Sequence, residues 1–145
     1  MQSGVKRILE WYNVAVGTFR ASIEIGDPRG SRFEMVEALV DTGTSYTWVP
    51  GDVLLRLDVL PQARWEFEIA GGRVIERDVA ETRARYENET RTTIVVFGDE
   101  GSLPLLGACA LEGFRLAPDP VNRRLIRVRS LAMAGAARAT TCQRL

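Results

Sequence analysis

One carboxylate in this chain stands where it could take part in catalysis. Asp41 directly follows residues 38–40, an apolar Ala-Leu-Val run that is typical of the end of a buried strand. A carboxylate in such surroundings is a candidate for acid–base chemistry. The turn after it supplies two hydroxyls, from Thr42 and Thr44, and a flexible Gly43 that lets the backbone bend sharply. Asp-Thr-Gly is also an ordinary turn sequence, so its interpretation depends on the rest of the chain.

A second motif follows further along the chain. Leu105 and Leu106 precede Gly107, which lies 66 positions after Asp41. Residues 108–114 are predicted to form a short helix, because a glycine stands near the expected C-terminal end. Residues 116–126 are predicted to form a turn and then a strand.

The two motifs, in this order and at this spacing, resemble those of the retropepsin-like aspartic proteases. The resemblance is strongest to the small single-domain bacterial members and covers about residues 14–128. It implies an all-β fold, a closed or partly closed barrel with one short helix near its C-terminal end. It also implies a homodimer, since Asp-Thr-Gly occurs once in the chain and each copy supplies half of an active site.

The resemblance implies a role for each residue of the two motifs. Asp41 is the catalytic residue, contributed once by each of two identical chains. Thr42 bonds across the dimer axis and holds both loops rigid. Gly43 lets the backbone approach the carboxylate, and Thr44 offers its hydroxyl to the outer carboxylate oxygen. Gly107 packs closely behind this loop.

A pair of carboxylates can hydrolyse a peptide bond without a cofactor. Two carboxylates about 3 Å apart share one proton, because both cannot ionise at that distance. One then acts as a base toward the attacking water, and the other as an acid toward the carbonyl oxygen. The expected substrate is therefore a peptide or protein, and neither a cofactor nor a metal is expected.

The resemblance also implies a flap over the bound peptide. The hairpin of residues 65–79 has the position of the family's flap. Its tip consists of Ala70, Gly71, Gly72 and Arg73. The alternative is that this hairpin is an ordinary part of the sheet.

Other side chains near the hairpin are expected to have structural roles. Trp48 and Trp65 are predicted to pack in the core rather than to contact substrate. Four arginines are expected to form a solvated face: Arg73, Arg77, Arg83 and Arg85.

Composition narrows the range of functions. The 19 basic and 19 acidic residues give a net charge of zero, so nothing favours a nucleic-acid partner. The chain has no histidine, which excludes Ser-His and Cys-His catalysis and histidine-ligated metal sites. Two cysteines, Cys109 and Cys142, are too few for a zinc site, and a disulfide between them stays open. Without a membrane-spanning or signal-peptide segment, a cytoplasmic protein is expected.

The remaining pattern predicts one mainly β domain. It spans residues 14–129, between an N-terminal extension (1–13) and a C-terminal tail (130–145). Alternating or β-branched apolar runs predict strands at residues 14–25, 33–40, 46–50, 65–69, 74–86 and 92–97. Residues 51–57 are predicted to form a short helix or a turn, and residues 131–139 a helix.

Two other functions fit part of this pattern. The first is a non-catalytic protein of the same fold that dimerises or binds extended peptides. The intact Asp-Thr-Gly-Thr sequence argues against it, since a binding module does not need the carboxylate. The second is a β-rich interaction module of unrelated fold. The spacing between Asp41 and residues 105–107 argues against that one.

Overall fold

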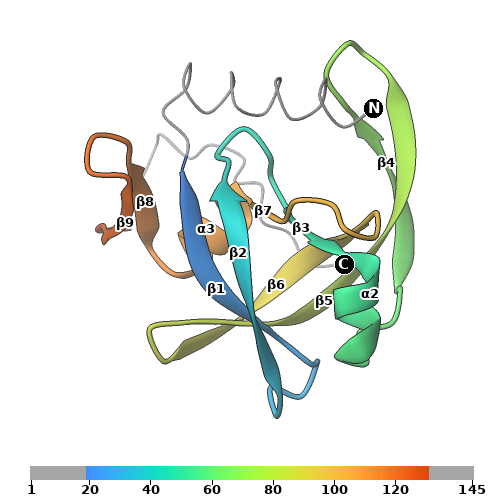
Figure 1. The fold of residues 1–145 in the computed structure, drawn as a ribbon, viewed down its shortest axis with the longest axis horizontal. Coiled ribbons are helices and arrows are strands. Elements are labelled where there is room, and N and C mark those ends of the chain that lie inside the picture. Colours follow the sequence, from blue (N-terminus) through green and yellow to red (C-terminus); the bar gives the residue numbers. More distant parts are fainter. Residues whose placement is uncertain (1–18, 131–145) are drawn as a thin grey trace, which may run out of the picture.

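A computed structural model describes residues 19–130 of the chain, and within them the regular structure is mostly β (Figure 1). The elements are β1 (Arg20–Gly26), β2 (Phe33–Val40), β3 (Thr47–Pro50), α2 (Gly51–Arg56), β4 (Ala63–Glu68), β5 (Val74–Tyr86), β6 (Glu89–Gly98), β7 (Leu105–Leu106), α3 (Ala108–Gly113), β8 (Leu116–Asp119) and β9 (Arg124–Arg127). Neither of these helices is long and apolar enough to cross a membrane.

The larger sheet closes into a barrel. Its strands follow the order β1-β2-β7-β3-β6-β5-β4, and β1 also pairs with β5. This extra pairing sets Glu24 opposite Arg85 and Ile25 opposite Ala84, which closes the ring and leaves β4 attached to β5 alone. The separate pair β8–β9 follows α3. The predicted all-β barrel with a short helix near its C-terminal end is thereby confirmed.

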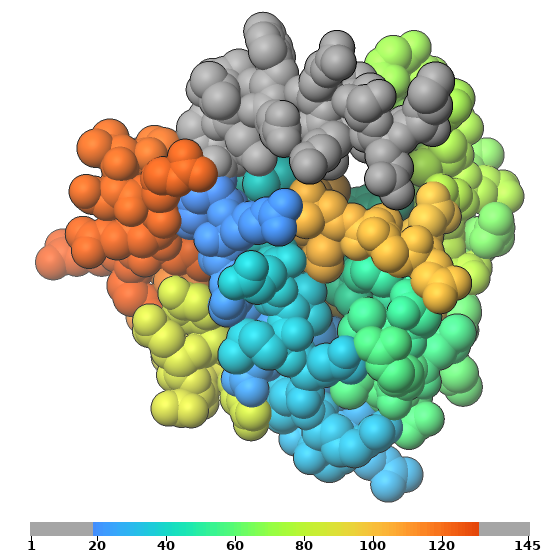
Figure 2. Space-filling view, in the orientation of Figure 1, coloured from blue at the N-terminus to red at the C-terminus, as the bar shows by residue number. Residues whose placement is uncertain are grey.

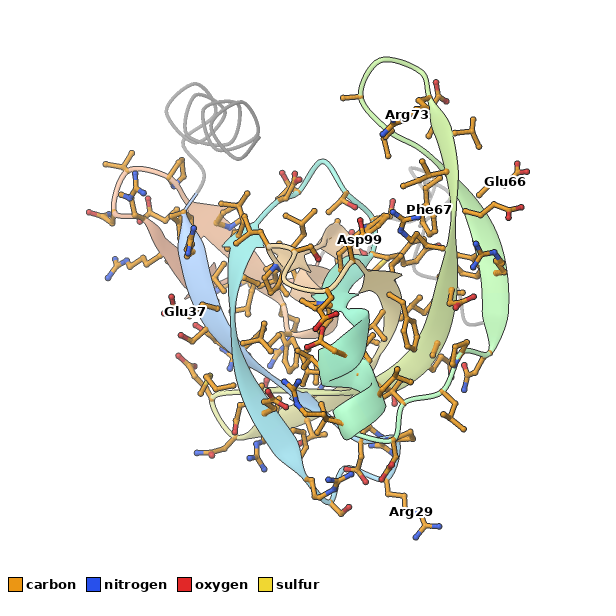
Figure 3. The ribbon with its side chains drawn as sticks, turned by 45° about the vertical axis from the view of Figure 1, so that its right-hand side comes forward. Arg29, Glu37, Glu66, Phe67, Arg73 and Asp99 are labelled. Atoms are coloured by element: carbon orange, nitrogen blue, oxygen red, sulfur yellow. The ribbon has the colours of Figure 1, made fainter. Side chains whose placement is uncertain are left out.

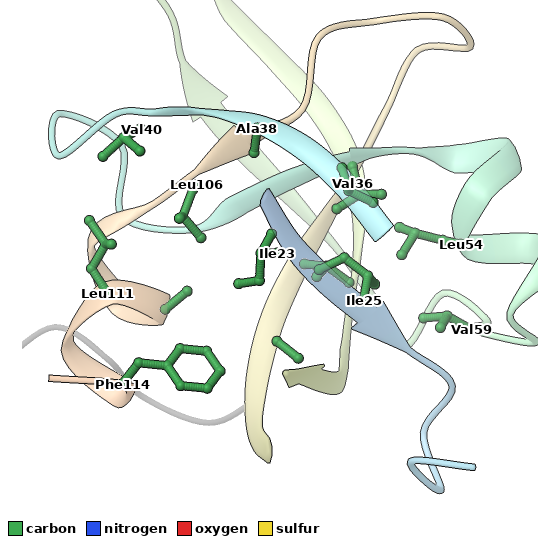
Figure 4. Packing of buried hydrophobic residues seen from close by; sticks show 14 of the residues in the cluster. Ile23, Ile25, Val36, Ala38, Val40, Leu54, Val59, Leu106, Leu111 and Phe114 are labelled. Atoms are coloured by element: carbon green, nitrogen blue, oxygen red, sulfur yellow. The ribbon is translucent and has the colours of Figure 1, made fainter. Parts of the chain in front are cut away.

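The main hydrophobic core fills this barrel (Figure 4). Alternate residues of each strand point inward, so that Ile23 and Ile25 of β1 meet Val36 and Ala38 of β2. The helices add large side chains, of which Leu54 from α2 and Phe114 after α3 are almost completely buried. Burial of these apolar surfaces is the principal force that holds the sheet in its curved form.

A second, smaller cluster lies outside the barrel core. Val79, Ile94 and Val96 are buried there, and partly buried aromatic side chains cover them. We call the four that matter for the site the aromatic cluster: Tyr46, Trp48, Trp65 and Phe67.

The turn between β1 and β2 is held by a buried carboxylate. Asp27 accepts hydrogen bonds from the backbone N–H groups of Ser31 (2.7 Å) and Arg32 (2.8 Å) and from the Ser31 hydroxyl (2.7 Å). These bonds favour the charged form, so they lower the pKa of Asp27 to about 2. The turn between β1 and β2 is therefore stabilised by a charged carboxylate.

Most predicted elements occur where they were expected. Strands β2 and β5 have the predicted bounds, and residues 51–56 form helix α2 rather than a turn. The prediction for residues 116–126 was wrong in its first part, since Leu116–Asp119 is strand β8. The turn comes later because the Asp119 carboxylate accepts the N–H groups of Val121 and Asn122. Pro118 is tolerated because, within residues 19–130, β8 pairs with β9 alone, which makes it an edge strand.

Some predictions concern residues that the structure does not describe. These are the N-terminal extension (1–13), the beginning of the strand predicted at 14–25, the helix predicted at 131–139 and Cys142.

Candidate active site

Asp41 begins a tight turn at the end of β2. Its backbone N–H donates to the carbonyl of Leu106 at 3.0 Å, which continues the parallel pairing of β2 with β7 by one residue. Its carbonyl accepts the N–H of Thr44 at 3.3 Å. Its carboxylate Oδ1 accepts the N–H of Gly43 at 2.9 Å, and the side chain is half-buried. The backbone of this turn therefore fixes the direction of the carboxylate.

The second motif holds the turn from behind. The first backbone N–H groups of a helix have no partner within the helix itself. In α3, the N–H of Ala108 donates to the carbonyl of Thr44 and that of Cys109 to the carbonyl of Ser45, both at 2.9 Å. The beginning of α3 and the Asp41 turn thus satisfy each other's backbone groups.

Gly107 allows this close approach. A Cβ atom at this position would lie 2.5 Å from the carbonyl oxygen of Tyr46 and 2.9 Å from that of Ser45. Such distances are too short for any side chain, so the site requires glycine. The buried Gly107 N–H donates to the Thr47 hydroxyl at 3.1 Å. The structure therefore brings together the two motifs that the sequence singled out.

The threonines of the turn have different surroundings. Thr44 is half-buried, and its hydroxyl donates to the carbonyl of Tyr46 at 3.4 Å. Thr42 and Gly43 are exposed on the single chain. The role of Thr42 across a dimer axis stays a prediction.

The predicted flap is a long hairpin made of β4 and β5, which rises beside the Asp41 turn in Figure 1. Its tip is closed by two hydrogen bonds, from Ile69 N–H to the Arg73 carbonyl (2.8 Å) and from Gly72 N–H to the Ile69 carbonyl (3.1 Å). Gly71 and Gly72 have φ angles of 90° and 78°, which other residues rarely adopt. Ala70 and Arg73 are exposed at the same tip (Figure 3).

Ring contacts join the hairpin to the strand that follows the Asp41 turn. The ring centroids lie 5.3 Å apart for Tyr46 and Trp65 and 5.2 Å apart for Trp48 and Phe67. Aromatic pairs at such distances attract one another beyond simple burial. Trp48 and Trp65 were predicted to pack in the core. They are half-buried and pack in the smaller cluster, outside the barrel core.

The prediction that four arginines form a solvated face is wrong for Arg85 and Arg77, which are partly buried. The side chain of Arg85 is 34% exposed and makes two 2.8 Å hydrogen bonds to Glu24, which lower the pKa of that carboxyl. Its guanidinium also lies 3.8 Å from the centre of the Phe33 ring. Arg77 is 29% exposed and lies beside the aromatic cluster. A signal for Arg77 was present, since it alternates with Ile75 and Val79 on one face of β5.

Two further features lie apart from this site. A hollow lined by Arg32, Phe33, Glu34, Arg56 and Leu57 is at the beginning of β2, the end opposite Asp41. Its charged groups pair with neighbours, as Arg56 does with Glu34 at 2.7 Å. Among residues 19–130, no three acidic or cysteine side chains are grouped so as to hold a metal.

No protein-family profile matches the chain, and no curated protein does. Several solved structures are similar to it, among them those of two proteases. The solution structure of the simian foamy virus (mac) protease is 19% identical, covers 64% of this chain and 91% of that chain, and has a TM-score of 0.47. The crystal structure of a retropepsin-like aspartic protease from Rickettsia conorii is 18% identical, covers 70% and 87%, and has a TM-score of 0.45. Both are partial similarities to solved structures, each at less than 20% identity.

Proposed function

We propose that this protein is an aspartic endopeptidase whose active unit is a homodimer. The observation that carries the proposal is the way in which the Asp41 turn is held. The Asp41 N–H donates to the Leu106 carbonyl, and the N–H groups of Ala108 and Cys109 donate to the carbonyls of Thr44 and Ser45. These bonds fix a short turn that presents one half-buried carboxylate. A turn without a chemical role does not need a second motif, 66 positions later, to hold it in place.

In the proposed reaction the Asp41 carboxylates of two chains share one proton. The ionised one removes a proton from a water molecule, which attacks the peptide carbonyl carbon. The protonated one donates to the carbonyl oxygen, and the resulting tetrahedral intermediate breaks down as the leaving nitrogen takes up a proton. The pair titrates as a unit, so neither carboxylate has a fixed role by itself.

The surrounding residues orient the carboxylate. Gly43 N–H donates to Asp41 Oδ1 at 2.9 Å, which fixes the rotation of the carboxylate plane. We assign to Thr42 the contact across the dimer axis and to Thr44 a supporting position beside the carboxylate. The tip residues Ala70, Gly71, Gly72 and Arg73 would cover the peptide and exclude water.

The test is Asp41→Asn, which keeps the shape of the side chain and the oxygen that accepts the Gly43 N–H. We expect the variant to fold like wild type and to lose peptide cleavage, measured by mass spectrometry on a mixed peptide library. Asp58→Asn is the matched control, because the Asp58 side chain is 83% exposed and lies on another part of the surface. Equal turnover by wild type and Asp41→Asn would contradict the proposal. Peptide binding without any turnover by wild type would favour the non-catalytic alternative.

A further inference from the structure

Arg77 is the charged residue on an otherwise apolar face of the β4–β5 hairpin. Residues directly opposite one another in an antiparallel pair share a face, as do alternate residues of one strand. The pairing sets Trp65 opposite Arg77, Phe67 opposite Ile75 and Ala63 opposite Val79. Five of these six residues are apolar, so Arg77 extends from a strand face that is otherwise apolar.

This face is turned toward the Asp41 turn. Trp65 contacts Tyr46, which lies five positions after Asp41, and Phe67 contacts Trp48, which is opposite Leu105 across the β3–β7 pair. In Figure 3, Phe67 points to the side of the hairpin where Asp99 lies, and Glu66 points away from it. Arg77 shares the face of Phe67 and therefore lies on the side of the hairpin that contacts Tyr46 and Trp48.

Asp99 belongs to the loop that joins β6 to β7. Figure 2 shows this loop at the surface, next to the β4–β5 hairpin. Asp99 is 80% exposed, and both of its carboxylate oxygens lie 3.4 Å from Arg77 Nη2. The loop leads directly into β7, whose Leu106 accepts the N–H of Asp41. The Arg77–Asp99 pair thus bridges the hairpin and the segment that holds the catalytic turn.

The hydrogen-bonding capacity of Arg77 is only partly used. A guanidinium carries five N–H donors. Nη1 donates to the Glu76 carbonyl at 2.9 Å, and the two contacts to Asp99 are long. Nε is buried and has no hydrogen-bond partner among the described residues. Arg85, in contrast, makes two 2.8 Å bonds to Glu24, the geometry of a structural pair.

We propose that Arg77 is a specificity-determining residue that binds a carboxylate side chain of the substrate peptide. The inference rests on the proposed function and adds a substrate class to it: peptides with glutamate or aspartate at the position beside the hairpin. The unused donors suit a carboxylate, which a guanidinium binds through two parallel hydrogen bonds. The Arg77 side chain is only 29% exposed, so less water competes for the bond than on an open surface. Asp99 neutralises Arg77 while no peptide is bound and gives way to the substrate carboxylate.

The test measures binding separately from cleavage. Fluorescein-labelled octapeptide pools carry glutamate, glutamine or lysine at one scanned position and mixed residues elsewhere. Their affinity for the Asp41→Asn protein is measured by fluorescence anisotropy. At one scanned position we expect the glutamate pool to bind about tenfold more tightly than the glutamine pool, the effect of one charge-assisted hydrogen bond.

Variants of the pair then identify the group responsible. Arg77→Gln should abolish the preference for glutamate, and Arg77→Glu should reverse it in favour of lysine, which misfolding cannot do. Asp99→Asn should strengthen binding of the glutamate pool, because it removes the competing carboxylate. Arg64→Gln is the matched control: Arg64 lies on the same hairpin but pairs with Glu76 and Asp78, and it should leave the preference unchanged.

The outcomes separate this inference from the proposed function. A glutamate preference that survives Arg77→Gln, or no preference at any position, would overturn the role of Arg77. Weaker glutamate binding by Asp99→Asn would show that the pair is structural, which also overturns it. An Arg77-dependent preference, together with no cleavage by the chain that retains Asp41, would leave the recognition intact and refute the protease.

Discussion

The hydroxyl of Thr47 accepts the backbone N–H of Gly107 at 3.1 Å, and both residues are buried. This contact joins strand β3, which leaves the Asp41 turn, to the glycine of the second motif. Thr47→Val keeps the shape but leaves the N–H without a partner. We expect unfolding to become easier by about 1–3 kcal/mol, measured by urea denaturation. Thr93→Val, at a buried threonine of β6 outside this contact, is the comparison and should cost less.

Gly107→Ala should destabilise the protein by about 1–3 kcal/mol, because the added methyl group meets backbone atoms that cannot move aside. Gly113→Ala in the same helix is the matched control. A Cβ at Gly113 meets no atom within 4 Å, so this change should be neutral or slightly stabilising. Equal melting temperatures for the two variants would show that the helix can shift away from the Asp41 turn.

Alanine at Gly71 or Gly72 should reduce peptide turnover more than it reduces stability. Both φ angles are positive, so alanine strains the tip and changes its shape. The tip lies outside the core, and the unfolding free energy should therefore fall by only about 1 kcal/mol. Gly30→Ala places a similar strain, at φ 70°, in the β1–β2 turn. If the Gly30 variant lost as much turnover as the tip variants, the hairpin would have no special part in catalysis.

Specific activity should fall when the protein is diluted through the dissociation constant of the dimer. The reason is that each chain contributes one Asp-Thr-Gly and hence half of the proposed site. Sedimentation and turnover are to be measured over the same range of concentrations. Constant activity per chain in a range where sedimentation detects only monomer would exclude the homodimer.

Asp27 should contribute to stability above about pH 4 and lose that contribution as the pH falls toward 2. The pKa of Asp27 is about 2 in the folded protein and near 3.8 when the hydrogen bonds of the turn are lost on unfolding. Between these two pH values, protonation of Asp27 therefore favours the unfolded chain. Asp27→Asn should melt at a lower temperature than wild type at pH 7. The difference should shrink between pH 4 and pH 2, and a difference that is constant with pH would contradict this explanation.

The sequence was sufficient to predict individual strands and to relate the two motifs to each other. Asp41 and Gly107 could be paired because their residue types and separation match a known arrangement, and β2 and β5 could be bounded from apolar alternation. Arg77 was assigned wrongly because alternation shows which residues share a face but not what covers it. On this face Trp65 and Phe67 are contacted by Tyr46 and Trp48, which are distant in the chain. The missed strand β8 shows the same limit, since its one partner in the part of the chain that the structure describes is β9.

The order of the strands has a consequence for folding while the chain is synthesised on the ribosome. Strand β7 pairs on one side with β2 and on the other with β3, although it is made more than 50 residues after both. A growing chain that ends before Leu106 lacks the carbonyl that receives the Asp41 N–H and the helix that holds the turn. Contacts between such distant segments form slowly. The Asp41 turn is therefore among the last parts of a nascent chain to take shape, and an unfinished chain carries the aspartate without its support.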